Sequence, residues 1–194
     1  MVWKNDQVSE GETVRILETA RKCLGVPGDF VELGCYKGDT SLMLADVLEN
    51  SNKKLWIYDS FEGLPEKKSQ DESLLGEPFK KGELSVSKRE VKERFLRAGL
   101  KVPVIKKGWF SDLTTEDLPE KIAFCFLDGD FYDSIRDGLK VINEKMARNG
   151  VIMVHDYLNP ALPGVKTAVS EWLKDKPSLK IETFESLIKI SINN

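Results

Sequence analysis

Residues 30–40 read FVELGCYKGDT, a short apolar strand followed by a glycine turn and the start of a helix. Gly34 and Gly38 make the tight turn, and Asp39 and Thr40 begin the helix. Glycines at such a turn let a ligand approach the backbone, and the free N–H groups at the helix start attract an anion such as a carboxylate. A tight turn without a ligand has the same pattern, so the rest of the chain has to decide between the two.

The order of strand and helix recurs along the chain. Strands are predicted at residues 30–33, 55–58, 102–105, 122–127, 151–154, 179–184 and 187–192. The last two lie too close together for a helical crossover, so they should pair antiparallel. The other strands alternate with helices, which requires a parallel sheet with right-handed crossovers and helices on both faces. We therefore predict one α/β domain over residues 1–194, with a Rossmann-like, seven-stranded and mostly parallel sheet.

Two helices and one long loop carry specific signals. Ser87 and Glu90 form a capping box at the start of one helix. Another helix has an apolar stripe from Ile135 to Met146 and is expected to end at Asn149–Gly150. Residues 60–86 form a long polar stretch after the second strand, and such a stretch in a compact domain is more often a functional lid than a linker.

Composition excludes several classes of protein. With 41% hydrophobic and 31% charged residues the chain is typical of a globular domain, and its longest apolar run is far too short to span a membrane. The net charge of −3 and the short basic clusters argue against nucleic-acid binding. The first residues have no leader pattern, so a cytoplasmic location is expected. Three cysteines without C-x-x-C spacing indicate neither a disulfide framework nor a zinc site.

The second strand ends at Asp59, the position at which Rossmann-type folds bind ribose hydroxyls. The glycine turn reads G-x-x-x-G and not G-x-G-x-x-G, which argues against a nicotinamide cofactor. No G-K-[ST] follows, which excludes a phosphate-binding P-loop. Ligands of parallel α/β sheets bind at the carboxyl ends of the strands, and each conspicuous polar cluster of this chain lies at such an end.

Five segments, taken in order, carry a resemblance to a known family. They are residues 30–40, DSFEGLP within 58–65, GWF at 108–110, DGDFYDS within 127–134 and VHDY at 154–157. Together they resemble the macrocin O-methyltransferase (TylF-like) family, which is similar to catechol-type O-methyltransferases. The resemblance implies S-adenosylmethionine (SAM) as cofactor and a divalent metal that holds the acceptor hydroxyls.

Carried over by position, the resemblance implies a complete cofactor site. The methionine end of SAM would lie among Glu32, Gly34 and Tyr36, with Gly38 in the same turn and Thr40 facing the carboxylate. Asp59 and Ser60 would lie at the ribose, and Gly108, Trp109 and Phe110 at the adenine. Asp128 would border the cofactor as well as the metal.

The metal site is where this chain departs from the family. Asp128 and Asp156 would be ligands of Mg²⁺ or Mn²⁺, but His155 stands where the family usually has a second aspartate. An imidazole is a poor ligand for Mg²⁺ and a better one for Mn²⁺. His155 is therefore a candidate ligand, and, as the chain's single histidine, also a candidate general base. Asp130 is the alternative base or a further ligand.

The sequence thus predicts a SAM-dependent O-methyltransferase acting on a hydroxyl of a small molecule, such as a sugar or polyol, with divalent metal assistance. One alternative is metal-independent methyl transfer to nitrogen or another acceptor. Another is a SAM-binding partner protein without catalysis. A homodimer is compatible with the sequence, and neither a nucleic acid nor a membrane is expected as a partner.

Overall fold

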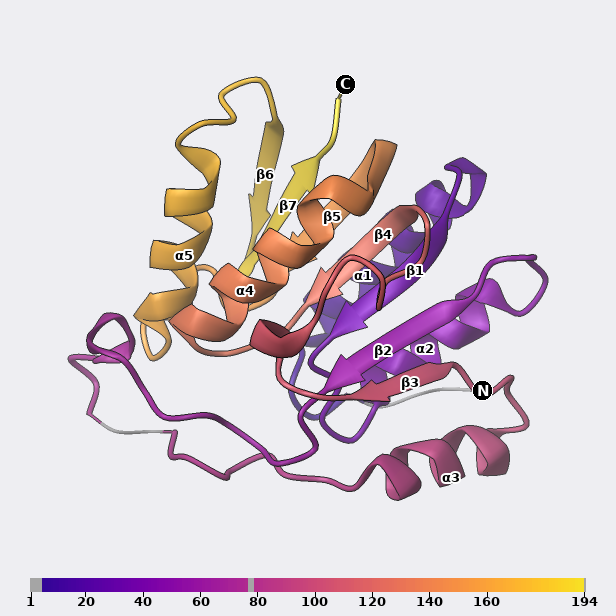
Figure 1. Ribbon diagram of the computed structural model, residues 1–194, viewed down its shortest axis with the longest axis horizontal. Coiled ribbons are helices and arrows are strands. Elements are labelled where there is room, and N and C mark those ends of the chain that lie inside the picture. Colours follow the sequence, from indigo (N-terminus) through magenta and orange to yellow (C-terminus); the bar gives the residue numbers. More distant parts are fainter. Residues whose placement is uncertain (1–4, 77–78, 194) are drawn as a thin grey trace.

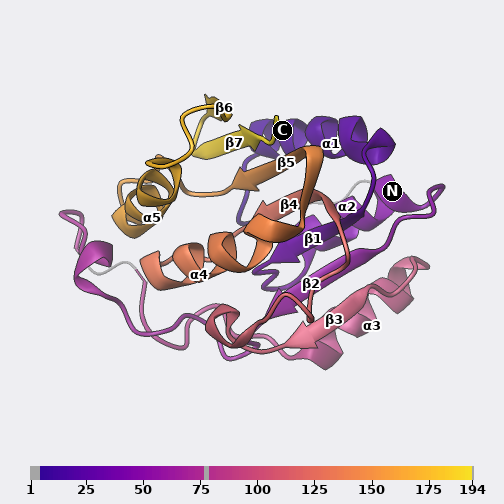
Figure 2. The same cartoon turned by 45° about the horizontal axis from the view of Figure 1, so that its top comes forward.

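The computed structural model describes residues 5–76 and 79–193. In these ranges a seven-stranded sheet has the order β3-β2-β1-β4-β5-β7-β6 (Figures 1 and 2). The strands are β1 (Asp29–Leu33), β2 (Leu55–Asp59), β3 (Val104–Lys107), β4 (Ile122–Leu127), β5 (Met146–Val154), β6 (Lys180–Phe184) and β7 (Leu187–Ser191). The first five are parallel, and β7 pairs antiparallel with both β5 and β6. The predicted fold class and the antiparallel final pair are confirmed.

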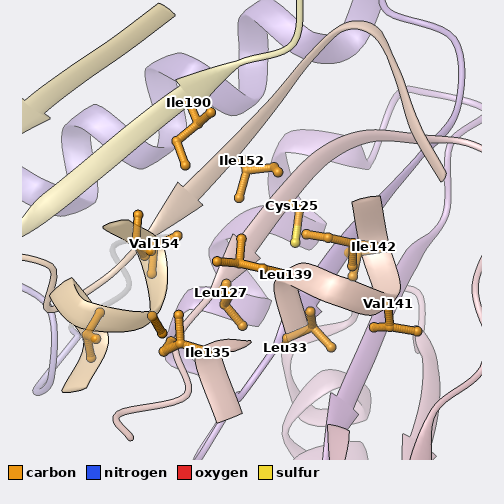
Figure 3. Close-up of a cluster of buried hydrophobic side chains, with 14 of the residues drawn as sticks. Leu33, Cys125, Leu127, Ile135, Leu139, Val141, Ile142, Ile152, Val154 and Ile190 are labelled. Carbon is orange, nitrogen blue, oxygen red and sulfur yellow. The ribbon is translucent and has the colours of Figure 1, made fainter. Parts of the chain in front are cut away.

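Helices cover both faces of the sheet, and two apolar cores lie between them and the strands. The helices are α1 (Glu10–Lys22), α2 (Asp39–Leu48), α3 (Lys88–Ala98), α4 (Tyr132–Ile142) and α5 (Pro163–Leu173). One core joins α4 and α5 to side chains such as Leu33, Leu127 and Ile152 (Figure 3). The other joins α1, α2 and α3 to Phe30 and Phe124, among others. Neighbouring residues of a strand point to opposite faces of the sheet. Because helices cover both faces, every residue of β4 is apolar and buried.

Local signals located most element ends correctly. The capping box of Ser87 and Glu90 starts α3, and the left-handed Gly99 ends it. Strand β3 was expected at residues 102–105 but lies two residues later. The three cysteines are free and buried.

The helix expected to extend to Met146 ends at Ile142, so that prediction was wrong. Met146 begins β5 and pairs with Ile122, and the register with β4 then shifts before Val151 joins Phe124. Asn149, with a φ of 62°, belongs to this irregular stretch rather than to a helix end. Met146 continues the helical spacing, but it is the pairing with β4 that determines its conformation.

Residues 60–86 connect β2 to α3 across the carboxyl edge of the sheet. The described part of this segment contains one short 3₁₀ helix, Ser69–Asp71, and no strand of the sheet. Residues 77–78 of the predicted lid lie outside the described ranges, as does the start of the chain at residues 1–4. In the part that the structure describes, no helix is long and apolar enough to cross a membrane.

Candidate functional site

A pocket of about 180 Å³ opens at the carboxyl ends of β1, β2, β4 and β5. Each strand end contributes its polar residues to the wall: Gly34 to Tyr36, Asp59 and Ser60, Asp128 to Asp130, and His155 with Asp156. The turn after β3 adds residues 108–110. This is the edge at which parallel α/β sheets bind ligands.

Gly34 allows β1 and β4 to approach each other closely at the floor of the pocket. Its φ is 87°, and a Cβ atom there would lie 1.9 Å from the carbonyl oxygen of Asp128. No side chain fits at this position without moving the backbone of the next strand. The turn after β1 is therefore positioned by contact with the end of β4.

Asp59 holds the glycine turn in place from the neighbouring strand. Its Oδ2 accepts hydrogen bonds from the backbone N–H groups of Cys35 at 2.8 Å and Tyr36 at 3.3 Å, and its Oδ1 accepts one from Phe61 at 2.7 Å. A carboxylate offers about four acceptor sites, so one remains for a ligand. Asp59 thus has a structural function that the sequence did not reveal, in addition to any contact with ribose.

Glu32 is a fully buried carboxyl group in the pocket wall. It accepts a short hydrogen bond from the hydroxyl of Ser41 on α2. Burial raises its pKa to about 8; the bond from Ser41 opposes this, and the carboxylates of Asp128 and Asp59 add to it. Glu32 therefore carries a proton over much of the neutral range in the absence of a ligand.

The opening of the pocket beside α2 is covered by the N-terminal segment. Asn5 donates a hydrogen bond from Nδ2 to Oγ1 of Thr40 at 2.9 Å, and its Oδ1 accepts bonds from the backbone N–H groups of Gln7 and Val8. All three of these N-terminal residues line the pocket. Thr40, the predicted carboxylate contact, therefore lies between the helix start and this segment.

Three potential metal ligands gather at the ends of β4 and β5. One ligand atom each from Asp128, His155 and Asp156 lie within 4.8 Å of one another. Nδ1 of His155 is 3.0 Å from Oδ1 of Asp128 and 3.1 Å from Oδ2 of Asp156. Asn159 donates a hydrogen bond to Oδ1 of Asp156 at 2.8 Å, which orients that carboxylate.

The other ring nitrogen of His155 faces a carboxylate from a different element. Nε2 lies 3.5 Å from Oε2 of Glu12 in the first turn of α1, and both side chains are only 6% exposed. Burial disfavours the charged ring, but the carboxylates of Asp128, Asp156 and Glu12 raise the pKa of His155 well above its usual range. Burial likewise opposes the charge of Glu12, yet hydrogen bonds from His155 and Ser186 lower its pKa to about 2.

Asp130 lies in the pocket wall next to this cluster. No hydrogen bond to its carboxyl group comes from the described residues. Burial of that group, together with the neighbouring carboxylates of Asp128 and Asp156, raises its pKa well above the usual range. Asp130 is thus a carboxyl group with unused acceptor sites directed at the pocket.

Four non-glycine residues with positive φ follow the strands that form the pocket. They are Tyr36 after β1 (44°), Phe61 after β2 (54°), Asp130 after β4 (58°) and Asp156 after β5 (58°). Side chains adopt this conformation at a cost, and such residues concentrate at functional sites. The turns that carry the polar side chains are therefore held in shape by the surrounding structure.

The structure brings nearly all predicted site residues to one pocket. The lining includes Glu32, Gly34, Tyr36, Thr40, Asp59, Ser60, Gly108, Trp109, Phe110, Asp128, Asp130, His155 and Asp156. Gly38 is the exception, because it caps α2 with a φ of 83° and does not line the pocket. The segment predicted as a lid contributes Gly63, Leu64, Pro65, Phe79 and Leu84.

Sequence reasoning missed several lining residues and the contact of Glu12 with His155. The missed lining residues include Asn5, Gln7, Val8, Ser134 and Asn159. Asn159 follows Asp156 by three residues, a spacing that could have indicated a local hydrogen bond. No sequence signal near Glu12 predicts its position beside His155. Glu12 forms the capping box of α1 with Ser9, and that role already accounts for a glutamate at this position.

Comparison with known proteins places the chain in a family. The family model of macrocin-O-methyltransferase (TylF) matches residues 14–185. A curated relative from Streptomyces olivaceus, 8-demethyl-8-(2,3-dimethoxy-alpha-L-rhamnosyl)-tetracenomycin-C 4'-O-methyltransferase, is 31% identical over 76% of this chain and 59% of the relative. Demethyldecarbamoylnovobiocin O-methyltransferase from Streptomyces niveus is 28% identical over 82% of this chain and 65% of the relative. The chain therefore spans about three fifths to two thirds of the length of these relatives.

A solved structure agrees with the sequence comparisons. The O-methyltransferase NovP superposes with a TM-score of 0.80 at 26% identity, over 92% of this chain and 79% of the other. The calicheamicin methyltransferase CalS11, at 16% identity and a TM-score of 0.77, shares the fold. The resemblance carried by the five sequence segments is confirmed: the chain belongs to the macrocin O-methyltransferase (TylF) family.

Proposed function

We propose that the protein is a SAM-dependent O-methyltransferase that acts on a hydroxyl group of a small, sugar-bearing molecule. The observation that carries this proposal is the single pocket in which the glycine turn, Asp59 and the Asp128–His155–Asp156 cluster meet. Membership of the TylF family supports the reaction type. The names of two relatives, one with a rhamnosyl-bearing acceptor, support the acceptor class.

The cofactor would lie along the carboxyl edge of the sheet. Its methionine end would lie among Glu32, Gly34, Tyr36 and Thr40, all of which line the pocket. Asp59 has one acceptor site left for the ribose, with Ser60 beside it. The turn of Gly108, Trp109 and Phe110 supplies an aromatic wall for the adenine.

The donor set at the ends of β4 and β5 fits a divalent metal. Two carboxylates and one imidazole, with ligand atoms within 4.8 Å of one another, form a mixed oxygen and nitrogen site. Such a set suits Mn²⁺ better than Mg²⁺. A bound divalent ion would hold the acceptor oxygen and lower the cost of its deprotonation. Asp128, Asp156 and His155 would be the ligands.

The protein's task in the reaction is alignment and removal of one proton. When bound, SAM would supply an electrophilic methyl group. The acceptor oxygen would attack it in line, the electron pair of the carbon–sulfur bond would go to sulfur, and the hydroxyl proton would pass to a base of the pocket. The products are the methyl ether and S-adenosylhomocysteine. No covalent intermediate with the enzyme is needed.

Asp130 fits the role of the base better than His155. Burial and the carboxylates of Asp128 and Asp156 raise its pKa, so it would accept a proton only with a divalent cation bound at those carboxylates, whose charge favours the ionised form. A base needs a free lone pair, and in this structure both nitrogens of His155 face carboxylates. If Nδ1 of His155 is a metal ligand, Nε2 carries the hydrogen and still offers no lone pair. Asp130 lies in the same pocket and accepts no hydrogen bond from the described residues.

The test is methyl transfer from SAM to candidate acceptors, including demethyldecarbamoylnovobiocin, with formation of S-adenosylhomocysteine and gain of one methyl group as readouts. Asp130→Asn should lower kcat about 10²–10⁴-fold. Its affinity for S-adenosylhomocysteine, measured by calorimetry, should stay unchanged. Full activity of this variant would exclude Asp130 as the base.

The metal part of the proposal has its own control. Excess chelator should abolish turnover, and Mn²⁺ should restore it better than Mg²⁺. Full activity with chelator would favour the metal-independent alternative. Binding of S-adenosylhomocysteine without turnover on any acceptor would favour a non-catalytic partner protein.

A further inference from the structure

Glu12 and His155 form a pair that links α1 to the end of β5. Glu12 is 5% exposed and His155 is 6% exposed, so neither side chain is available to bulk water. Oε2 of Glu12 and Nε2 of His155 form an ion-pair contact at 3.5 Å, which is longer than the usual N–H···O range of about 2.7–3.2 Å. In the described part of the chain no other acceptor faces Nε2. The ring is thereby oriented with Nδ1 toward Asp128 and Asp156.

The carboxylate of Glu12 is itself held in one orientation. Its Oε1 accepts hydrogen bonds from the backbone N–H of Ser186 at 3.0 Å and from the Ser186 hydroxyl at 2.5 Å. Its Oε2 accepts one from the backbone N–H of Ser9 at 3.2 Å. Three elements, α1, the turn between β6 and β7, and the end of β5, therefore meet at one carboxylate.

We propose that Glu12 is a positioning residue for the metal site: it fixes the hydrogen of His155 on Nε2, so that Nδ1 presents its lone pair toward Asp128 and Asp156. This inference rests on the proposed function, because it assigns a part of the same site. A metal-bound histidine usually donates its other ring N–H to a carboxylate, which fixes the tautomer and the ring orientation. Glu12 is the residue in place to accept that bond.

The chemistry also explains why a histidine at this site needs a partner on another element. An aspartate needs no partner on a second element to present an oxygen to a cation. An imidazole has two possible tautomers, and only one leaves Nδ1 free to bind a metal. A buried carboxylate facing Nε2 selects that tautomer. His155 and Glu12 therefore form a functional unit, although they lie far apart in the sequence.

The test is Mn²⁺ affinity of Glu12→Gln, measured by titration calorimetry in the presence of S-adenosylhomocysteine. Ser186 donates both of its hydrogen bonds to Oε1, so the amide oxygen of glutamine will stay on that side. The amide nitrogen will then take the place of Oε2, where it loses the hydrogen bond from the backbone N–H of Ser9. It will face His155 and donate to Nε2, which moves the ring hydrogen to Nδ1. We expect Mn²⁺ affinity to fall about 10–100-fold.

Two matched controls separate positioning from stability. Ser9→Ala removes the hydrogen bond that the Ser9 hydroxyl accepts from the backbone N–H of Glu12, and Ser186→Ala removes the one that the Ser186 hydroxyl donates to Oε1. Both variants keep the carboxylate of Glu12, so both should retain Mn²⁺ affinity within about twofold of the wild type. In a His155→Ala background, Glu12→Gln should have no further effect on Mn²⁺ affinity, because no ring is left to orient.

Any of three results would overturn the proposal. The first is a Glu12→Gln variant with unchanged Mn²⁺ affinity, and the second is a serine variant that loses as much Mn²⁺ affinity as Glu12→Gln. The third is a wild-type protein that binds no Mn²⁺. Binding of S-adenosylhomocysteine is measured on the same samples. Its absence in the wild type would instead contradict the proposed methyltransferase function.

Discussion

Glu32 shows how burial of one residue can affect both the pocket and the stability of the fold. Its carboxyl group lies in the pocket wall, bonded to Ser41, with a pKa of about 8 in place of 4.5. Between those two values the folded protein keeps a proton that the unfolded chain has released. Stability from this group is therefore fully present below about pH 4.5 and is lost as the pH rises toward 8.

The first prediction concerns Glu32→Gln. This variant should lose the fall in stability that the wild type shows between about pH 4.5 and 8, a slope of up to about 1.4 kcal/mol per pH unit. Glutamine keeps an oxygen that can accept the bond from Ser41. Urea denaturation at several pH values measures the slope. The exposed Glu18→Gln is the control, and parallel curves for wild type and Glu32→Gln would refute the prediction.

At the scale of elements, the segment 60–86 is attached to the domain more firmly than a free lid. Leu64, near the start of the segment, is hydrogen-bonded to residues near its end. Its N–H donates to the carbonyl of Glu83, and its carbonyl accepts from the N–H of Gly82. In the middle of the segment, Asp71 is 1% exposed and accepts a hydrogen bond at 2.7 Å from the N–H of Tyr132, the first residue of α4. The loop thus supplies the cap that α4 lacks locally.

The fit around Asp71 is tight. A Cβ atom at Gly164 in α5 would lie 1.9 Å from Oδ1 of Asp71, so only glycine leaves room for the carboxylate. By contrast, Leu74 and Leu75, which follow Asp71 in the segment, are exposed. The lid predicted at residues 60–86 is therefore attached to the domain at Asp71, and ligand-dependent motion stays a prediction for its exposed part.

The Asp71→Ala variant tests whether the carboxylate of Asp71 attaches residues 60–86 to α4. The variant should lose about 1–3 kcal/mol of stability, because the N–H of Tyr132 becomes buried without a partner. Limited proteolysis within residues 60–86 should also become faster. Glu72→Ala, an exposed neighbour, is the matched control. Cleavage of Asp71→Ala at the wild-type rate would show that the carboxylate does not hold the segment.

In the whole molecule, the pocket is formed by segments that are far apart in the sequence. Its walls come from the ends of four strands, the turn after β3, the N-terminal segment and residues 60–86. A ligand there would connect segments that are far apart in the chain. It should therefore stabilise the folded state as a unit.

Thermal unfolding with S-adenosylhomocysteine measures this coupling. At 100 times its dissociation constant, a ligand that binds only the folded state adds about 2.7 kcal/mol of stability. For a domain of this size that corresponds to a rise in Tm of about 5–10 °C. NAD at the same concentration is the control and should cause no shift. A shift with NAD and none with S-adenosylhomocysteine would contradict the proposed cofactor.

Local sequence patterns were enough to predict the fold class, the order of the elements and most residues that line the pocket. Apolar periodicity is local, so Ile122 to Leu127 could be recognised as a buried central strand. Parallel strands bring their carboxyl ends to one edge, so Asp59, Asp128 and Asp156 could be expected to lie near one another. The five family segments gave these residues their expected roles.

Only the tertiary structure decided which side chains from distant elements meet. Pairing with β4 makes Met146 a strand residue despite its helical spacing. Packing of α1 on the sheet brings Glu12 to His155, and the path of residues 60–86 brings Asp71 to α4. Such contacts depend on how whole elements pack and cross, which no short-range pattern in the sequence encodes. They determine the hydrogen-bond partners, and thereby the protonation, of the groups in the pocket.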